Sequence, residues 1–204
     1  GLFFITDWFR ADSPDRIDMM AYNEPTLLLE GGDEIDLSGQ SFTMKRDQAL
    51  IKNDADNLLS YEAEGGTDKA KIVHNRLIIP RGKTYRLVLE DGTKVWLNAQ
   101  PTLTYSHDFG RNERNVELDG GAYFEVAKNK EIPFYVNTET NQVRVVETHF
   151  NVCAYRGSNE FTTTLLEGIV DIYAKGSEHS LTRLGVNEVF IFWDGKFRKE
   201  RFTD

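Results

Sequence analysis

Turn signals that contain glycine recur along the whole sequence, and they lie too close together to leave room for long helices. Short segments with alternating apolar and polar residues flank them, which is the period expected of half-buried strands. The clearest signal is Asp91-Gly92, because glycine tolerates the positive φ that a tight hairpin requires. We therefore predict an all-β chain of many short antiparallel strands and hairpins, forming a two-layer sandwich or a solenoid-like β-domain, with a barrel as the alternative. Hairpins or paired strands are expected at residues 27–37, 87–97, 116–124, 142–155, 163–173 and 187–197.

The first two of these segments match each other at an offset of 60 residues. The match indicates an internal repeat of one hairpin unit, or only the pattern that every hairpin needs. Ile35 of the first segment aligns with Val95 of the second. The identical positions are Leu27, Leu29, Glu30, Gly32 and Leu37, which recur as Leu87, Leu89, Glu90, Gly92 and Leu97.

A polar stretch over residues 61–76 separates the first of these hairpins from the rest of the chain. Its glycines and charges, with little apolar content before Ile72, predict an exposed loop or linker. We accordingly divide the chain into an N-terminal segment, residues 1–76, with a hairpin and this linker, and a main β-domain, residues 77–204. A strand at residues 76–79 is expected to lead into the main domain.

Composition narrows the classes of function. The chain has 204 residues and a net charge of −9, and such an acidic surface repels phosphate backbones and anionic headgroups. We therefore expect no nucleic-acid partner and no direct binding to a membrane surface. The single cysteine, Cys153, cannot form an intramolecular disulfide or a Cys-based metal site, and we expect it to be a small buried apolar residue.

No run of 18 or more apolar residues exists that could span a membrane. The opening Leu2-Phe3-Phe4-Ile5 is either the cut end of a transmembrane helix or the apolar start of an ordinary element. We favour the cut end, because Asp7, Arg10, Asp12 and Asp15 follow it as a polar exit. Residues 1–76 are then a juxtamembrane segment.

The sequence offers no constellation of catalytic or metal-binding residues. His74, His107, His149 and His179 are far apart and outside any metal-binding spacing. Residues 53–57 begin like a calcium loop, but Gly65 stands where the bidentate Glu is needed. The acidic pairs Glu30/Asp33 and Glu90/Asp91 fall at turns, where carboxylates accept backbone hydrogen bonds. We predict no enzyme activity, no cofactor and no metal site.

Aromatic residues are the remaining candidates for a binding surface. Such side chains can form a flat platform for sugar rings, although in alternating strands most of them pack in the core. We favour core burial for Trp96, and a carbohydrate-binding β-sandwich module stays the alternative function. A β-sandwich hydrolase is a third and weaker interpretation. The candidates are Trp96, Tyr105, Tyr123, Trp193 and Phe197.

Seven motifs follow one another at residues 79–85, 89–98, 103–105, 114–126, 133–136, 148–152 and 165–170. In this order they resemble the motifs of the FecR family, the periplasmic domain of membrane-anchored anti-sigma factors. The most recognisable, Leu89–Asn98, is similar to the family pattern Leu-x-Asp-Gly-Thr-x-Val-x-Leu-Asn. The chain departs from the family at Gly121 and Glu147, where Glu and Gly are usual, and around residues 184–188, where Pro-Gly-Glu is usual.

The resemblance implies a signalling role. It implies a periplasmic sensor, tethered to the inner membrane through a span absent from this chain, that contacts the signalling domain of an outer-membrane TonB-dependent transporter. A cytoplasmic part, also absent here, would bind an ECF sigma factor, and regulated proteolysis would release it. A small α/β domain would follow residues 198–204. Neither the residues nor the resemblance identifies the partner-binding residues.

Overall fold

The computed structural model describes residues 18–64, 72–106 and 113–202. The apolar opening, its polar exit, His107 and residues 65–71 of the predicted linker lie outside this part. The described chain is 60% strand with essentially no helix, which confirms the predicted all-β class. One short 3-10 helix, η1 (Met19–Ala21), precedes the strands β1 (Thr26–Leu28), β2 (Glu34–Asp36), β3 (Phe42–Arg46), β4 (Ala49–Asp54), β5 (Leu58–Ala63), β6 (His74–Ile78), β7 (Tyr85–Val88), β8 (Lys94–Ser106), β9 (Arg114–Glu125), β10 (Phe134–Asn137), β11 (Asn141–Val145), β12 (Thr148–Ala154), β13 (Glu160–Gly168), β14 (Val170–Ala174), β15 (Ser180–Leu184), β16 (Glu188–Trp193) and β17 (Lys196–Arg201).

Hydrogen bonding joins these strands into one mixed sheet that folds into two facing layers. Layer 1 holds β3, β4, β5, β7, β12, β13, β16 and β17, in that order. Layer 2 holds β2, β1, β6, β10, β11, β14 and β15. The long strands β8 and β9 belong to both layers. One half of β8 pairs with β7 and the other with β6, and one half of β9 pairs with β12 and the other with β10.

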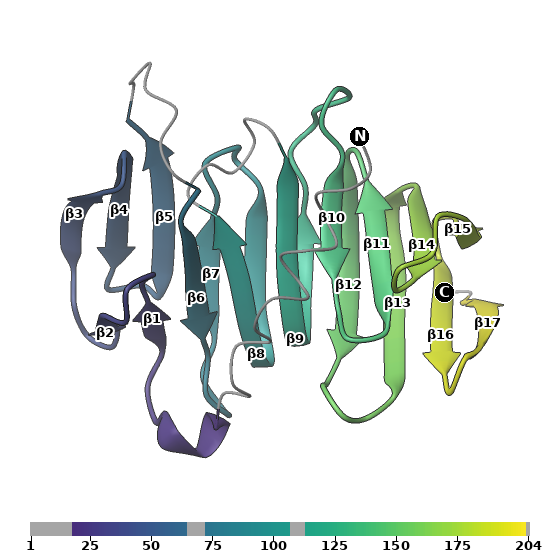
Figure 1. Cartoon of the computed structure of the whole chain (residues 1–204), viewed down its shortest axis with the longest axis horizontal. Coiled ribbons are helices and arrows are strands. Elements are labelled where there is room, and N and C mark those ends of the chain that lie inside the picture. The colour runs from purple at the N-terminus through teal and green to yellow at the C-terminus, as the bar shows by residue number, and fades with distance from the viewer. Residues whose placement is uncertain (1–17, 65–71, 107–112, 203–204) are drawn as a thin grey trace.

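The layers do not close on each other, so the described chain is a sandwich and the barrel alternative is wrong. From β3 at one end to β17 at the other, the strands follow the long axis of the molecule broadly in chain order, while β1 and β2 lie between β3 and β6 (Figure 1). Two pairs, β5–β7 and β9–β10, are parallel, which the all-antiparallel prediction missed. Parallel pairing arises because the chain visits the opposite layer between the two strands and returns in the same direction.

The core fills the space between the layers. Phe124 of β9 stacks on Phe150 of layer 1 at a ring-centroid distance of 5.2 Å and meets Phe134 of layer 2 edge-on at 6.0 Å. Towards β3, the hydroxyls of Tyr61 and Tyr105 meet at 2.8 Å and join the two layers through a buried hydrogen bond. Inward residues alternate with outward ones along most strands, as the pleat requires.

The hairpins at the offset of 60 residues are confirmed. Leu27 lies opposite Ile35 in β1–β2, and Leu87 lies opposite Val95 in β7–β8. Both turns are closed in the same way: the Leu29 N–H donates to the Asp33 carbonyl at 2.9 Å, and the Leu89 N–H donates to the Thr93 carbonyl at 2.9 Å. The hairpin β16–β17 is confirmed as well.

Three other predicted hairpins are wrong, because the chain changes layer instead of reversing within one. Residues 116–124 lie in the single strand β9, which bends at Gly120. Residues 142–155 form β11 in layer 2 and β12 in layer 1. Residues 163–173 form β13 and β14, which also lie in different layers.

The polar stretch at residues 61–76 is only partly a loop. Tyr61 is buried in β5 and residues 74–76 begin β6, so its two ends belong to the sheet. β1 pairs with β6 and β5 pairs with β7, so strands on both sides of residue 76 share one core. The domain division at residue 76 stays a prediction.

Candidate interaction surface

A buried arginine organises one end of the sandwich. Arg114, at the start of β9, is fully buried. Its guanidinium donates to the Asp91 carboxylate at 3.1 Å and to the carbonyls of Ile132 at 2.7 Å and Val146 at 3.2 Å. The carbonyls of Ala127 and Asn129 accept its remaining hydrogen bonds. A buried charge of this kind is stable only with such complete partners, so we call the set the Arg114 lock.

The Arg114 lock joins segments that are distant in the sequence. Asp91 also accepts from the Thr93 N–H at 2.9 Å and from its hydroxyl at 2.8 Å, which fixes the β7–β8 turn. The Thr93 hydroxyl in turn accepts from the Ala127 N–H at 3.1 Å. The loop at residues 127–132 is thereby held against both the hairpin and the start of β9. The sequence predicts that Asp91 lies at a turn and accepts backbone hydrogen bonds, and the bond from the Thr93 N–H confirms it. The pairing of Asp91 with Arg114 is not predicted, because the sequence identifies Arg114 only as part of a motif.

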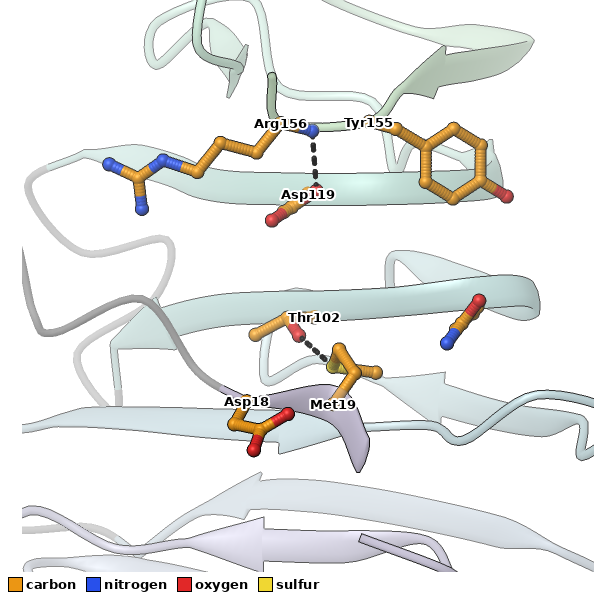
Figure 2. A pocket seen from close by; sticks show the side chains of 7 residues that line it. Asp18, Met19, Thr102, Asp119, Tyr155 and Arg156 are labelled. Carbon is orange, nitrogen blue, oxygen red and sulfur yellow. Dashed lines mark hydrogen bonds between the residues drawn. The ribbon is translucent and has the colours of Figure 1, made fainter. Parts of the chain in front are cut away.

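A polar cleft of about 470 Å³ lies where β8 and β9 pass between the layers (Figure 2). Asp119 in the bend of β9 accepts from the Arg156 N–H at 2.9 Å, and the Thr102 hydroxyl contacts the Met19 sulfur at 3.4 Å. The Tyr155 hydroxyl donates to the Ala99 carbonyl at 2.6 Å. Asp119, Thr102 and Tyr155 thus already have partners, so the cleft suits a role in structure better than one in chemistry. The lining residues are Asp18, Met19, Gln100, Thr102, Asp119, Tyr155 and Arg156.

The aromatic candidates mostly do not lie in the core. Tyr105 is buried, as expected, but Trp96 lies half-buried on the outer face of layer 1, and its predicted core burial is wrong. Val95 and Leu97 face the core, so the strand pleat points Trp96 outward, where its ring packs on Tyr123 at 5.2 Å. Trp193 is 57% exposed on the same layer, and the Lys196 ammonium lies 5.6 Å from its ring. Phe197, on the edge strand β17, stacks on the buried Phe190 with a distance of 5.4 Å between the ring centroids.

The cysteine prediction is also wrong. Cys153 is exposed on the outer face of β12, because its neighbours Val152 and Ala154 take the two inward positions. Partial burial and the nearby Glu160 raise the pKa of its thiol, so the thiolate that would act as a nucleophile is disfavoured.

The described histidines and turn carboxylates have structural contacts, such as the hydrogen bond of 2.9 Å that the His74 N–H donates to the Glu30 carboxylate. Burial lowers the pKa of His74, with Glu30 opposing, and His149 lies 3.2 Å from the Glu167 carboxylate. No cluster of three or more metal-ligating side chains occurs within residues 18–64, 72–106 and 113–202. Asn53 of the predicted calcium-like loop is buried and donates to the carbonyls of Leu37 and Gln40 at 3.0 and 2.7 Å. No helix in the same ranges is long and apolar enough to cross a membrane.

Comparisons with known proteins assign one part of the chain to a family. The model of the family described as "FecR protein" matches residues 75–171. Residues 75–171 are a FecR domain. Two crystal structures of a putative anti-sigma factor from Parabacteroides distasonis ATCC 8503 are similar to the chain at 30% identity, with TM-scores of 0.58 and 0.57. They cover 63% and 62% of this chain, and the chain spans only 60% and 59% of theirs. No curated protein matches.

The FecR domain contains Arg114 and all its hydrogen-bond partners. Its motif at residues 89–98 forms the β7–β8 turn with Asp91, and its motif at residues 114–126 is strand β9 with Arg114. The segments that resemble the family therefore build the Arg114 lock and the strands shared by the two layers. We conclude that these motifs specify the frame of the domain.

Proposed function

We propose that the chain is the periplasmic sensor region of an anti-sigma factor tethered to the inner membrane. In this role it relays the state of an outer-membrane TonB-dependent transporter to an ECF sigma factor. The transporter's signalling domain binds the sensor region, and the sigma factor binds a cytoplasmic part of the protein. The chain itself carries out no reaction.

The FecR domain is the observation that carries this proposal. The similarity to the P. distasonis protein supports the same role, since the two chains share 30% identity over the matched part. The described surface also offers binding features rather than catalytic ones. The carboxylates at the turns serve backbone and ion-pair contacts.

The test is a binding assay with the isolated signalling domains of TonB-dependent transporters from the same cell. The full 204-residue chain is immobilised, and each domain is titrated over it. Saturable binding to one domain supports the role and names the pathway. The binding assay is repeated with a protein that is extended at its C-terminal end. The proposal fails if none of the domains binds in either assay.

A second candidate, binding of glycans, is favoured by one observation. Trp96, Tyr123 and Trp193 lie outward on layer 1, where flat rings can stack on sugars. Titration of oligosaccharides while tryptophan fluorescence is recorded separates the two functions. A saturable shift that disappears in Trp193→Ala would favour the glycan module.

A further inference from the structure

A second groove, of about 410 Å³, opens at the end of the sandwich that the Arg114 lock organises. Its side chains come from the loop after β9, from β11, β14 and β15, and from the crossings between the layers. We call it the basic groove, because four basic residues and only two acidic ones line it. The lining residues are Lys128, Lys130, Arg144, Val145, Val146, Glu147, Gly168, Ile169, Asp171 and Arg183.

Strand pairing places three of these residues in one outward row on layer 2. Arg144 of β11 lies opposite Asp171 of β14, and Asp171 lies opposite Arg183 of β15. β11 and β14 run side by side in Figure 1. The Arg183 guanidinium binds the Asp171 carboxylate with two hydrogen bonds, at 2.8 and 3.2 Å. Because neighbouring strands are about 5 Å apart, Arg144 lies within the reach of a ligand that also touches this pair.

The basic groove has unused positive charge. Glu147 pairs with Lys128 at 3.8 Å, and Asp171 pairs with Arg183, so both acidic side chains of the groove have a partner. Lys130 and Arg144 form no ion pair within the part of the chain that the structure describes. This local surplus stands out against the net charge of −9 for the whole chain.

The wall of the basic groove is preorganised. The Arg114 lock holds the carbonyls of Ala127, Asn129 and Ile132, which lie on either side of Lys128 and Lys130. The Asn129 side chain also accepts from the N–H groups of Glu131 at 3.0 Å and Ile132 at 3.2 Å. A rigid wall lowers the entropy lost when a ligand binds.

An exposed apolar side chain lies beside these charges. Ile169 is 57% exposed at the crossing from β13 to β14. The preceding Gly168 has a φ of +96° and packs so closely that a Cβ would lie 2.5 Å from the Glu147 carbonyl oxygen. The backbone therefore fixes Ile169 in this outward position.

We propose that the basic groove binds an extended acidic peptide segment of a partner protein. Carboxylates of the segment pair with Lys130 and Arg144, and an apolar side chain between them packs on Ile169. A short peptide interacts only with the charges of the groove, because charges farther away than the Debye length of about 8 Å are screened. Nucleic acid and anionic membranes fit less well, because they extend beyond the groove and are repelled by the acidic remainder of the surface. The inference goes beyond the proposed function, since it holds for whichever protein supplies the segment.

The test measures fluorescence anisotropy of a fluorescein-labelled peptide, Gly-Glu-Glu-Leu-Glu-Asp-Gly, titrated with the full chain. A matched peptide with Gln and Asn in place of the acids is the charge control. The variant Lys130→Gln/Arg144→Gln is compared with Lys45→Gln/Lys52→Gln. The second variant removes the same charge on β3 and β4, where the lysines pair with Glu64 and Glu62. Circular dichroism verifies that both variants are folded.

We expect saturable binding of the acidic peptide, and a dissociation constant about tenfold weaker in Lys130→Gln/Arg144→Gln. The β3–β4 variant and the wild type should agree within about twofold. Equal losses in the two variants would show only general charge attraction and overturn the proposal. Absence of binding, or equal binding of the neutral peptide, would overturn it too.

The variant Ile169→Ser tests the apolar contact separately. It should weaken the binding of the leucine-containing peptide about threefold and leave the binding of a peptide with Ser in place of Leu unchanged. Sulfated oligosaccharides and vesicles with anionic lipids are titrated in parallel. If either binds through Lys130 and Arg144 while the peptide does not, the groove serves another class of ligand and the proposal is wrong.

Discussion

Single buried polar side chains hold together parts of this fold that apolar packing alone would leave free to slide. Asn53 donates to two carbonyls and accepts from the Tyr85 hydroxyl, and so ties β4 to β7 and to the chain after β2. The Arg114 lock does the same within the FecR domain. Hydrogen bonds of this kind have defined directions, so they specify one strand register, whereas apolar contacts alone are compatible with several registers.

Replacement of Arg114 should therefore be costly. Arg114→Met keeps most of the side-chain volume, but it leaves the Asp91 carboxylate without its cation and several carbonyls without donors. We expect a loss of about 3 to 5 kcal/mol in the free energy of unfolding, measured by urea denaturation. Arg198→Ala, which breaks an exposed pair with Glu200, should change it by less than about 1 kcal/mol. Similar losses in both variants would contradict the lock.

His74 should make stability depend on pH. Burial lowers the pKa of His74 below its ordinary 6.5, with the Glu30 carboxylate opposing. Between the folded and the unfolded pKa the unfolded chain binds more protons, so stability is complete above pH 6.5 and declines as the pH falls through that window. Urea titrations from about pH 7.5 to 5 should show the wild type losing stability relative to His74→Gln. If the free energy of unfolding changed with pH in the same way in both proteins, His74 would not be the source of the pH dependence.

At the scale of elements, the features that set this fold apart are the two strands shared by both layers. β8 and β9 pair along their whole length, with shifts in register between Leu97 and Thr102. Opposite those shifts lies Gly120, with a φ of +118°, where a Cβ would lie 2.7 Å from Cα of Pro101. The bend therefore needs both a backbone conformation and a close approach that only glycine provides.

A side chain at Gly120 should disturb this bend. We expect Gly120→Ala to lower the free energy of unfolding by about 3 kcal/mol, from backbone strain together with the clash. Gly176→Ala is the matched control, because Gly176 also has a positive φ, of +79°, but has open space around it. The control should cost about 1 kcal/mol by the same urea assay. Equal costs would show that the close approach to Pro101 does not matter.

The sequence could predict the strands, but not which of them pair. Gly92, Gly120 and Gly168 all adopt a positive φ, yet the first closes a hairpin, the second bends one strand and the third carries the chain between layers. Local glycine chemistry is the same in all three places. What differs is the partner strand, and pairing between distant segments leaves no local signal.

The same limit applies to the surfaces. Lys130, Arg144 and Arg183 are far apart in the sequence, and the register of β11, β14 and β15 brings the last two together. A local signal for the outward position of Trp96 does exist, because Val95 and Leu97 on either side of it are apolar and both face the core. The family could be predicted, because its motifs depend on local residues in a fixed order.

At the scale of the whole molecule, the core is continuous from one end of the sandwich to the other. One cluster of buried apolar side chains includes Leu27 and Ile51 before residue 76 and Phe150 and Phe190 well after it. Cooperative unfolding is expected when one core spans a chain, because no part can open without exposing apolar surface of the next. The domain division at residue 76 can therefore be tested by cutting the chain.

A fragment of residues 72–204 keeps β6 and the whole FecR domain but lacks β1 to β5. It loses one strand partner of β6, which is β1, and one of β7, which is β5, and β8 stays as the other partner of both. It also loses the Tyr61 hydroxyl that meets Tyr105, and it exposes inward side chains of β6 and β7 to water. We expect its melting temperature in differential scanning calorimetry to fall by at least about 10 °C, or its cooperative transition to vanish. Each kcal/mol of lost stability lowers the melting temperature of a chain of this size by about 2 to 4 °C. A chain ending at residue 194 is the control. It loses only β17, whose side chains are all exposed, and it should melt within a few degrees of the full chain. If the 72–204 fragment melted like the full chain, residues before 76 would be a separate unit, and the predicted division would hold as a physical boundary.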